Sequence, residues 1–533
     1  MTHYRSKIAL IAGILTCFES AQAADVYWDA TPGTPNGASD GGAGTWDTST
    51  ANWDDGSYAS WNNTNNDVAV FGGTAGVVDL GANVTVGGLT FNTTNYSVGP
   101  GLGPYGITFG SPGTIDVSTG TTTITAAIGG SNKITKTGSG TLYLNGANTF
   151  SGDIDISGGR LQIADGANEG AMLGAASNTL TFIGNSELYN SNGTATVGQG
   201  ITINNGVTGK IGGAFGERTQ VNGVFAGSGT LLVQGYSAGF DVELLNTANT
   251  FTGDIQLRSG DGVTLGVRSL VDSVSTISLQ SNSNLGGTFE YMSGATSSMT
   301  LNSRQFELAV NGNSGTNFGR QASIRNNAAI ANTVTINTSL AITGTGNKTF
   351  ILGGGNGGNN AFNGAIVDAL GTSKLTLHKM DGGKWILGGA NTYEGDTIVD
   401  AGTLELANSG ELLFIVGALG ENNSILGDAT NANLNLNGTL VFDLAGASTA
   451  ISDSWNIVDV ANLNETYGGS FGVKSTLGSF TDVDGDLWTL AENGVLYEFQ
   501  ESTGVLTVGV IPEPSVALLG GLGMLLLLRR RRA

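Results

Sequence analysis

The chain has 533 residues, 87 of them glycine, and a formal net charge of −22. The acidic excess disfavours nucleic acid and anionic membrane surfaces as partners. The one cysteine, Cys17, lies close to the start of the chain, which excludes disulfides and thiol catalysis from the body. Glycine follows no Gly-X-Y period, so a collagen-like fold is excluded as well.

Residues 1–23 have the features of a secretory signal peptide. Two basic residues precede a short apolar run, and small residues follow it. The run is too short for a permanent membrane anchor, which needs about 20 apolar residues. We expect signal peptidase to cut at the small residues Ala21, Ala23 and Ala24.

Residues 24–107 are expected to form an N-terminal cap and the first coils of a repetitive fold. Four tryptophans here each precede Asp or Asn: Trp28, Trp46, Trp53 and Trp61. Exposed rings could stack on sugars. We favour the alternative that they fill the open end of the fold, because the first unit of a repeat array has no neighbour on one side.

Residues 108–440 carry a unit of about two dozen residues that recurs. Residues 141–164, TLYLNGANTFSGDIDISGGRLQIA, return as residues 384–407, KWILGGANTYEGDTIVDAGTLELA, and residues 247–257 are a looser copy. Apolar and polar residues alternate with period 2, and segments rich in Gly, Asn and Asp separate the strands.

This pattern predicts an all-β, elongated right-handed parallel β-helix with three strands per coil and roughly 16 to 18 coils. Gly and Asn tolerate the positive φ angles of tight corners, which suits the segments between the strands. The residues expected to point inward are Leu142, Leu144, Ile154, Ile156, Leu161, Ile163, Leu387, Ile398, Leu404 and Leu406.

The two best copies of the repeat share one motif. Its residues are Asn148, Thr149, Phe150 and Gly152 in the first copy, and Asn391, Thr392, Tyr393 and Gly395 in the second. They resemble the autotransporter-associated β-strand repeat, whose core reads L-x-G-x-N-T-Y-x-G-x-T-x-I-x-x-G-x-L. The resemblance implies a bacterial secreted or surface β-helix, and it implies little about activity.

Residues 441–510 are expected to form a C-terminal β cap. Three carboxylates alternate along one acidic stretch: Asp482, Asp484 and Asp486. They could bind Ca²⁺, the only cofactor that the sequence offers. The EF-hand order of glycine and glutamate is not met, so we favour a solvated acidic turn.

The tail, residues 511–533, resembles the PEP-CTERM sorting signal. An apolar run follows Pro-Glu-Pro and would form a short transmembrane helix, with terminal arginines left in the cytoplasm. The resemblance implies processing by an exosortase in the inner membrane of a Gram-negative bacterium that makes exopolysaccharide. The sorting residues are Pro512, Glu513, Pro514, Arg529, Arg530, Arg531 and Arg532.

No catalytic residue is predicted. The chain has two histidines, and the second, His378, has no histidine partner in the body for a triad or a zinc site. An aspartate recurs at the same place in each repeat copy, which favours a structural role over a catalytic one. These recurring residues are Asp153, Asp254 and Asp396.

We therefore expect a non-enzymatic structural or adhesin-like protein at the cell surface or in the extracellular matrix. Its expected partners are exosortase and signal peptidase during export, and extracellular polysaccharide afterwards. We expect the chain to contact the membrane only through its C-terminal segment, before processing. The alternative is a carbohydrate-active β-helix, either a polysaccharide lyase or hydrolase or a glycan-binding protein, for which Arg160, Arg258 and Arg268 are the scattered basic candidates.

Overall fold

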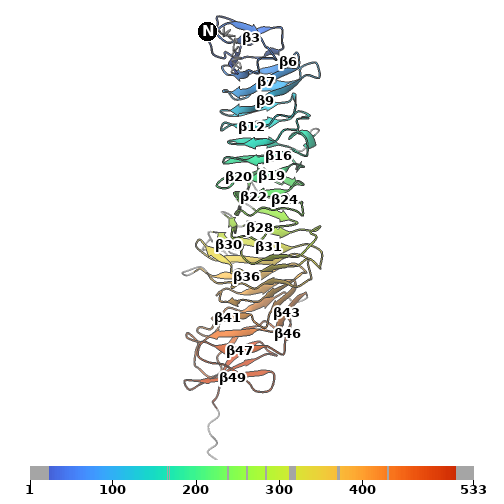
Figure 1. Cartoon of the computed structure of the whole chain (residues 1–533). Helices are drawn as coiled ribbons and strands as arrows, with labels where there is room; N and C mark the ends of the chain where they lie inside the picture. Colours follow the sequence, from blue (N-terminus) through green and yellow to red (C-terminus); the bar gives the residue numbers. More distant parts are fainter. Residues whose placement is uncertain are drawn as a thin grey trace, which may run out of the picture.

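The computed structural model is a long stack of β-strand coils (Figure 1). It describes residues 23–511 except for positions 165, 167–168, 237–238, 260–261, 282–284, 311–319, 369–372 and 429–430. The described chain is a right-handed parallel β-solenoid of about 14 turns. Its strands form six sheets, and one short 3₁₀ helix, η1 (Glu169–Ala171), interrupts them. The prediction of an all-β parallel β-helix is confirmed.

Two long sheets begin at the N-terminal end. Sheet 1 runs in the order β4 (Tyr58–Ser60), β3 (Ala51–Asp54), β1 (Asp25–Trp28), β5 (Val68–Phe71), β7 (Val84–Phe91), β9 (Gly106–Val117), β12 (Ile134–Thr137), β14 (Ile154–Ile156), β16 (Thr179–Phe182), β19 (Gly200–Ile203) and β22 (Phe225–Gly227), with β11 (Ala127–Gly129) paired to β9. Sheet 2 runs in the order β2 (Gly44–Trp46), β6 (Val77–Leu80), β8 (Ser97–Gly99), β10 (Thr121–Ile124), β13 (Thr141–Leu144), β15 (Arg160–Ile163), β17 (Ser186–Asn190), β20 (Thr208–Gly213), β23 (Thr230–Gly235), β25 (Ile255–Ser259), β27 (Thr276–Ser281), β30 (Gln305–Val310) and β33 (Ala341–Thr343).

Three further parallel sheets begin later in the chain. Sheet 3 runs in the order β18 (Thr194–Val197), β21 (Arg218–Val221), β24 (Phe240–Leu244), β26 (Val263–Val267), β28 (Leu285–Tyr291), β31 (Arg320–Asn326), β34 (Lys348–Gly353), β36 (Leu375–Lys379), β39 (Thr397–Val399) and β42 (Ile425–Gly427). Sheet 4 contains β29 (Met299–Leu301), β32 (Val334–Ile336), β35 (Asn360–Phe362), β37 (Lys384–Leu387), β40 (Gly402–Leu406), β43 (Ala432–Leu436) and β46 (Asn464–Tyr467). Sheet 5 contains β38 (Ala390–Asn391), β41 (Glu411–Ile415), β44 (Thr439–Asp443) and β47 (Gly472–Ser475).

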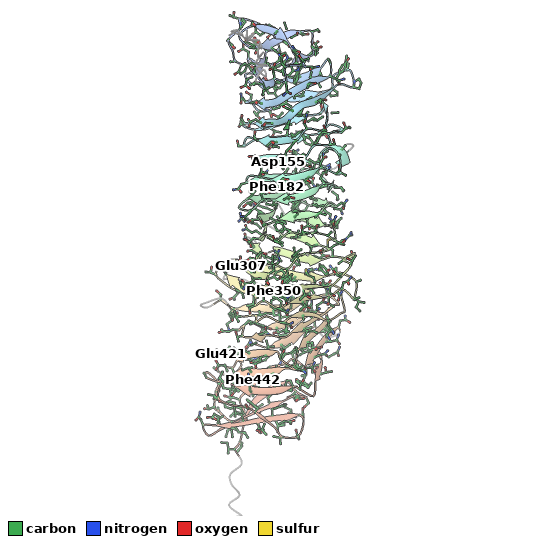
Figure 2. All side chains as sticks on the ribbon, in the orientation of Figure 1. Asp155, Phe182, Glu307, Phe350, Glu421 and Phe442 are labelled. Carbon is green, nitrogen blue, oxygen red and sulfur yellow. The ribbon has the colours of Figure 1, made fainter. Side chains whose placement is uncertain are left out.

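The core is a continuous apolar column along the axis of the stack. In the solenoid, strands pair in parallel register with strands of the next coil, as Ile154 of β14 pairs with Leu180 of β16. Alternate side chains of each strand therefore enter the same interior. Phe182, Phe350 and Phe442 are all fully buried and mark three levels of this core (Figure 2).

Nine of the ten residues expected to point inward are buried. The exception is Ile398, the middle residue of β39, which is only partly buried, while its neighbours Thr397 and Val399 are buried. Ile398 occupies the place of Asp155 in the first copy of the repeat. The prediction for Ile398 was wrong because an apolar side chain can stand on the outer face of a strand, and burial here follows the position in the coil.

The coils also vary in length more than the repeat indicates. A coil takes 20 residues from Ile134 to Ile154 but 35 residues from Met299 to Val334. The stack therefore has fewer turns than the 16 to 18 expected. In the first copy of the repeat, the third side of the coil, residues 145–153, has no strand. Parallel pairing runs from β1 to β47, across the boundaries expected at 107 and 440.

The four N-terminal tryptophans are buried against one another at the first coils. Their ring centroids lie 4.8–5.3 Å apart, and at most 3% of any of the four residues is exposed. The polar residue that follows each tryptophan accepts hydrogen bonds from backbone N–H groups of a nearby loop, as Asp47 does from Ser49 and Thr50. These buried rings offer no face to a sugar, so that interpretation of the tryptophans was wrong.

The C-terminal end of the described chain is antiparallel. Sheet 6 runs in the order β45 (Ser454–Asn456), β51 (Val505–Gly509), β50 (Val495–Gln500), β49 (Leu487–Glu492) and β48 (Thr481–Asp482). It lies at the lower end of the stack (Figure 1). No helix among residues 23–511 has the length and hydropathy to span a membrane. The segment expected to cross the membrane and all of the expected sorting residues from Pro512 to Arg532 lie outside the described residues, as does Ala21.

Candidate functional site

The asparagine of the repeat motif connects three successive coils. Asn148 accepts a hydrogen bond from the backbone N–H of Ile128 in the coil before, and donates one to the carbonyl of Met172 in the coil after, both at 2.8 Å. Asn391 does the same with Ile366 and Glu411, both at 3.1 Å. Both asparagines are at least 97% buried. An amide carries both a donor and an acceptor, so one buried side chain satisfies backbone groups on either side.

The recurring aspartate and glycine of the repeat also lie at contacts between successive coils. Asp153 Oδ1 accepts the backbone N–H of Thr179 at 2.7 Å, and Asp396 Oδ1 accepts that of Ser424 at 2.9 Å. Asp254 bonds the backbone of the next coil in the same way. At Gly152 and Gly395, a side chain would place its Cβ within 2.2 Å of a backbone oxygen of the preceding coil. The recurring motif residues thus hold the stack together. The exceptions are Thr149 and Thr392, whose side chains are exposed.

The aromatic position of the motif differs between the copies, and its partner differs with it. Phe150 lies in the same core as the apolar Ile154. The second copy has Tyr393 and Thr397 at these places, and their buried hydroxyls share a hydrogen bond of 2.6 Å. Burial raises the pKa of Tyr393. An apolar pair has therefore been exchanged for a hydrogen-bonded pair in the same position.

Tyr393→Phe is expected to lower the free energy of unfolding by about 1–2 kcal/mol, because it leaves the buried hydroxyl of Thr397 without a partner. Thr397→Val is expected to lower the free energy of unfolding by a similar amount, because it leaves the buried hydroxyl of Tyr393 without its partner. The double variant should recover most of the loss, as measured by urea unfolding in a double-mutant cycle. Phe150→Tyr in the first copy is the matched control. It should lower the free energy of unfolding, because the apolar Ile154 offers the new hydroxyl no hydrogen-bond partner. Additive effects in the cycle would show that the two hydroxyls are not coupled.

One residue of the repeat, a buried lysine, lies outside the two aligned segments and was therefore not predicted. Lys136 and Lys379 stand at equivalent places, five residues before the segments aligned above, and each is at most 1% exposed. Each ammonium group donates to three backbone carbonyls at 2.5–3.2 Å. The acceptors are Thr137, Gly138 and Gly158 for Lys136, and Met380, Asp381 and Ala401 for Lys379. Extending the alignment toward the N-terminus would have found the shared lysine.

Residues 134–163 and 377–406 match a family model described as passenger-associated-transport-repeat, and each match begins just before the buried lysine. The chain carries autotransporter-associated β-strand repeats. It is also 40% identical over 248 residues to a protein of Brucella suis biovar 1 (strain 1330) named adhesin BmaC autotransporter. That match covers 45% of this chain and 7% of the relative. No solved structure shows significant similarity to the chain.

The three aspartates considered for Ca²⁺ each have separate partners in the C-terminal sheet. Asp482 and Asp484 accept backbone N–H groups of their own turn, and Asp486 accepts hydrogen bonds from Gln500 and Ser502. Within residues 23–511, apart from the gaps given above, no three His, Cys, Asp or Glu side chains are grouped closely enough to hold a metal ion. The geometry is that of an acidic turn. Calcium binding stays the alternative hypothesis, and calorimetric titration of the chain with calcium would test it.

The other candidate residues stand apart from one another. His378 pairs with Asp400, with Nε2 and Oδ2 separated by 2.5 Å. Arg258 lies on β25 and contacts glutamines, and Arg268 follows β26 and bonds the carbonyl of Ser293. Arg160 lies on β15 among two tyrosines, a glutamate and a lysine, which are connected to it by ion pairs and ring contacts.

Proposed function

We propose that this chain is an exported structural or adhesin-like β-solenoid, displayed at the surface or in the extracellular matrix of a Gram-negative bacterium. It contributes contacts rather than chemistry. One observation carries the proposal: the recurring Asn, Asp and Lys side chains of the repeat bond one coil to the next. The similarity to an autotransporter named as an adhesin supports the same function.

We further propose that the mature chain begins at Ala24 and ends near Pro512, after signal peptidase and exosortase have removed the two ends. The backbone nitrogen of Ala24 lies 3.1 Å from Oδ1 of Asp67. A cut after Ala23 would turn this nitrogen into an ammonium group and the contact into an ion pair, which is stronger than a neutral hydrogen bond. The tryptophan cluster would then close the N-terminal end of the stack, and the antiparallel sheet 6 the other end.

Intact-mass analysis of protein released from the cell surface tests both parts of this proposal. We expect a chain that starts at Ala24 and lacks Arg529 to Arg532. Labelling of intact cells with a reagent that cannot cross membranes should modify the same chain. A mass that retains the four arginines would contradict exosortase sorting, and a chain labelled only after lysis would contradict surface display.

Glycan binding is a second candidate function, and one observation favours it. Two partly exposed tyrosines lie next to cationic side chains on the outer face of sheet 2, in a chain that has few cations. The two candidates are compatible, because a surface rod can hold a polysaccharide through one of its faces.

A further inference from the structure

Five side chains form one connected group on the outer face of sheet 2, which we call the tyrosine–cation cluster. Its members come from four successive coils: Arg160 on β15, Glu187 and Tyr189 on β17, Lys210 on β20, and Tyr236 directly after β23. Parallel strands are spaced by about 4.8 Å, so the cluster extends along the axis of the stack over roughly 14 Å.

The contacts within the cluster hold its charged groups in fixed positions. Glu187 lies between the two cations, 2.8 Å from Arg160 Nε and 3.3 Å from Lys210 Nζ. The hydroxyl of Tyr236 bonds all three of these side chains at 2.5–3.0 Å. The guanidinium of Arg160 lies over the ring of Tyr189, 4.0 Å from its centroid. Long side chains that are already ordered lose less entropy when they bind a ligand.

A glycine leaves space at the centre of the cluster. Gly212 of β20 stands in register with Tyr189, at a position where a side chain would point outward. A Cβ there would lie 2.4 Å from Oε1 of Glu187. The glycine therefore lets the carboxylate lean across the strand toward Lys210. Gly212 is therefore buried beneath the carboxylate. Tyr236, at the edge of the cluster, is 52% accessible.

The charge of the cluster differs from that of the whole chain. Among the five members two cations face one carboxylate, whereas the chain has 21 basic and 43 acidic residues. A second carboxylate, that of Glu217, lies close enough to Tyr189 to help raise the pKa of that tyrosine, after the larger effect of burial. Guanidinium groups bind carboxylates with paired N–H donors. The hydrogen bonds of Arg160 to Glu187 and Tyr236 use two of its five N–H donors. Tyrosine rings offer flat apolar surface, with a polar tip, for the C–H face of a sugar ring. A ligand that suits both features is a sugar that carries a carboxylate.

We propose that the tyrosine–cation cluster binds an acidic polysaccharide built from uronic acids. This inference rests on the proposed function, because such a polymer meets the chain only outside the cell. The cluster is an extended strip on an outer sheet face, so it suits a polymer lying along the stack. A uronate carboxylate would bind at Arg160 and Lys210, and neighbouring rings of the polymer would stack on Tyr189 and Tyr236.

The test is calorimetric binding of the purified mature chain to alginate oligomers, with dextran oligomers of similar length as the neutral comparison. We expect alginate to bind and dextran to bind at least tenfold more weakly. Arg160→Gln combined with Lys210→Gln should weaken alginate binding at least tenfold, and added salt should weaken it further in the unmodified chain. Arg218→Gln is the matched control, because Arg218 is also an ion-paired cation on an outer sheet face, that of sheet 3, and it should leave binding unchanged.

Two results would overturn the inference: equal binding of alginate and dextran, or alginate binding that survives the double substitution. Tyr189→Ser removes a ring without changing the charge and should also weaken binding, so it decides the matter if the double variant fails to fold. Surface labelling of intact cells separates the two proposals. A labelled chain that does not bind alginate would end this inference alone, and an unlabelled chain would contradict the proposed function.

Discussion

Asn391→Ala is expected to lower the free energy of unfolding by about 2–4 kcal/mol. The substitution removes an amide that is 99% buried and leaves the N–H of Ile366 and the carbonyl of Glu411 without this partner. Each buried backbone group left unsatisfied costs about 1–3 kcal/mol. Urea unfolding followed by circular dichroism measures the change.

Thr392→Ala is the matched control for this experiment. Thr392 is the next residue of the motif, but its side chain is exposed, so its loss should change stability by less than about 0.5 kcal/mol. If both variants unfolded at the same urea concentration as the unmodified chain, the asparagine would not be holding the coils together.

Lys379→Met is expected to destabilise the stack by a similar amount at pH 7, because three carbonyls lose their donor. It should also change the pH dependence. Burial lowers the pKa of Lys379 and of Lys136 to about 8, from 10.5. Between these values the unfolded chain binds more protons than the folded chain, so the free energy of unfolding rises with pH from about 8 to about 10.5.

Buried tyrosines oppose this rise at its upper end. Burial raises the pKa of Tyr96 to about 12, so the folded chain keeps a proton that the unfolded chain loses above about pH 10. Stability should therefore increase from pH 8 to about pH 10 and then decrease. Thermal unfolding across pH 7–11 measures both parts. Lys379→Met should reduce the rise by about half, and an undiminished rise would show that other groups cause it.

The recurring unit predicted the solenoid, because alternating apolar residues alone would also fit a β-sandwich. The alternation predicted most of the core. Leu142 and Leu144, for example, are buried as the period of 2 requires. The same rule failed at Ile398, because the second copy of the repeat places a buried Thr397 in the core and satisfies its hydroxyl with Tyr393. The pairing of Tyr393 with Thr397 could be found only by noticing that both positions differ between the two copies of the repeat.

Other features depend on distances that the sequence does not give. The recurrence of Asp153 indicated a structural role, but the partner of its carboxylate lies 26 residues further on and follows from the length of that coil. The tyrosine–cation cluster joins Arg160 to Tyr236 across 76 residues. Coil lengths vary too much for such contacts to be assigned from a fixed period. The acidic turn at Asp484 is local, because its carboxylate accepts the N–H groups of the residues two and three positions further on.

The claim that this chain contributes contacts rather than chemistry is tested most directly by deleting its gene. Biofilm cohesion and growth on a panel of acidic and neutral polysaccharides should be measured side by side in the deletion strain and in a strain with the gene restored. We expect cohesion to fall and growth on every polysaccharide to stay unchanged. Normal cohesion, together with lost growth on one polysaccharide, would contradict the account and indicate a carbohydrate-active enzyme.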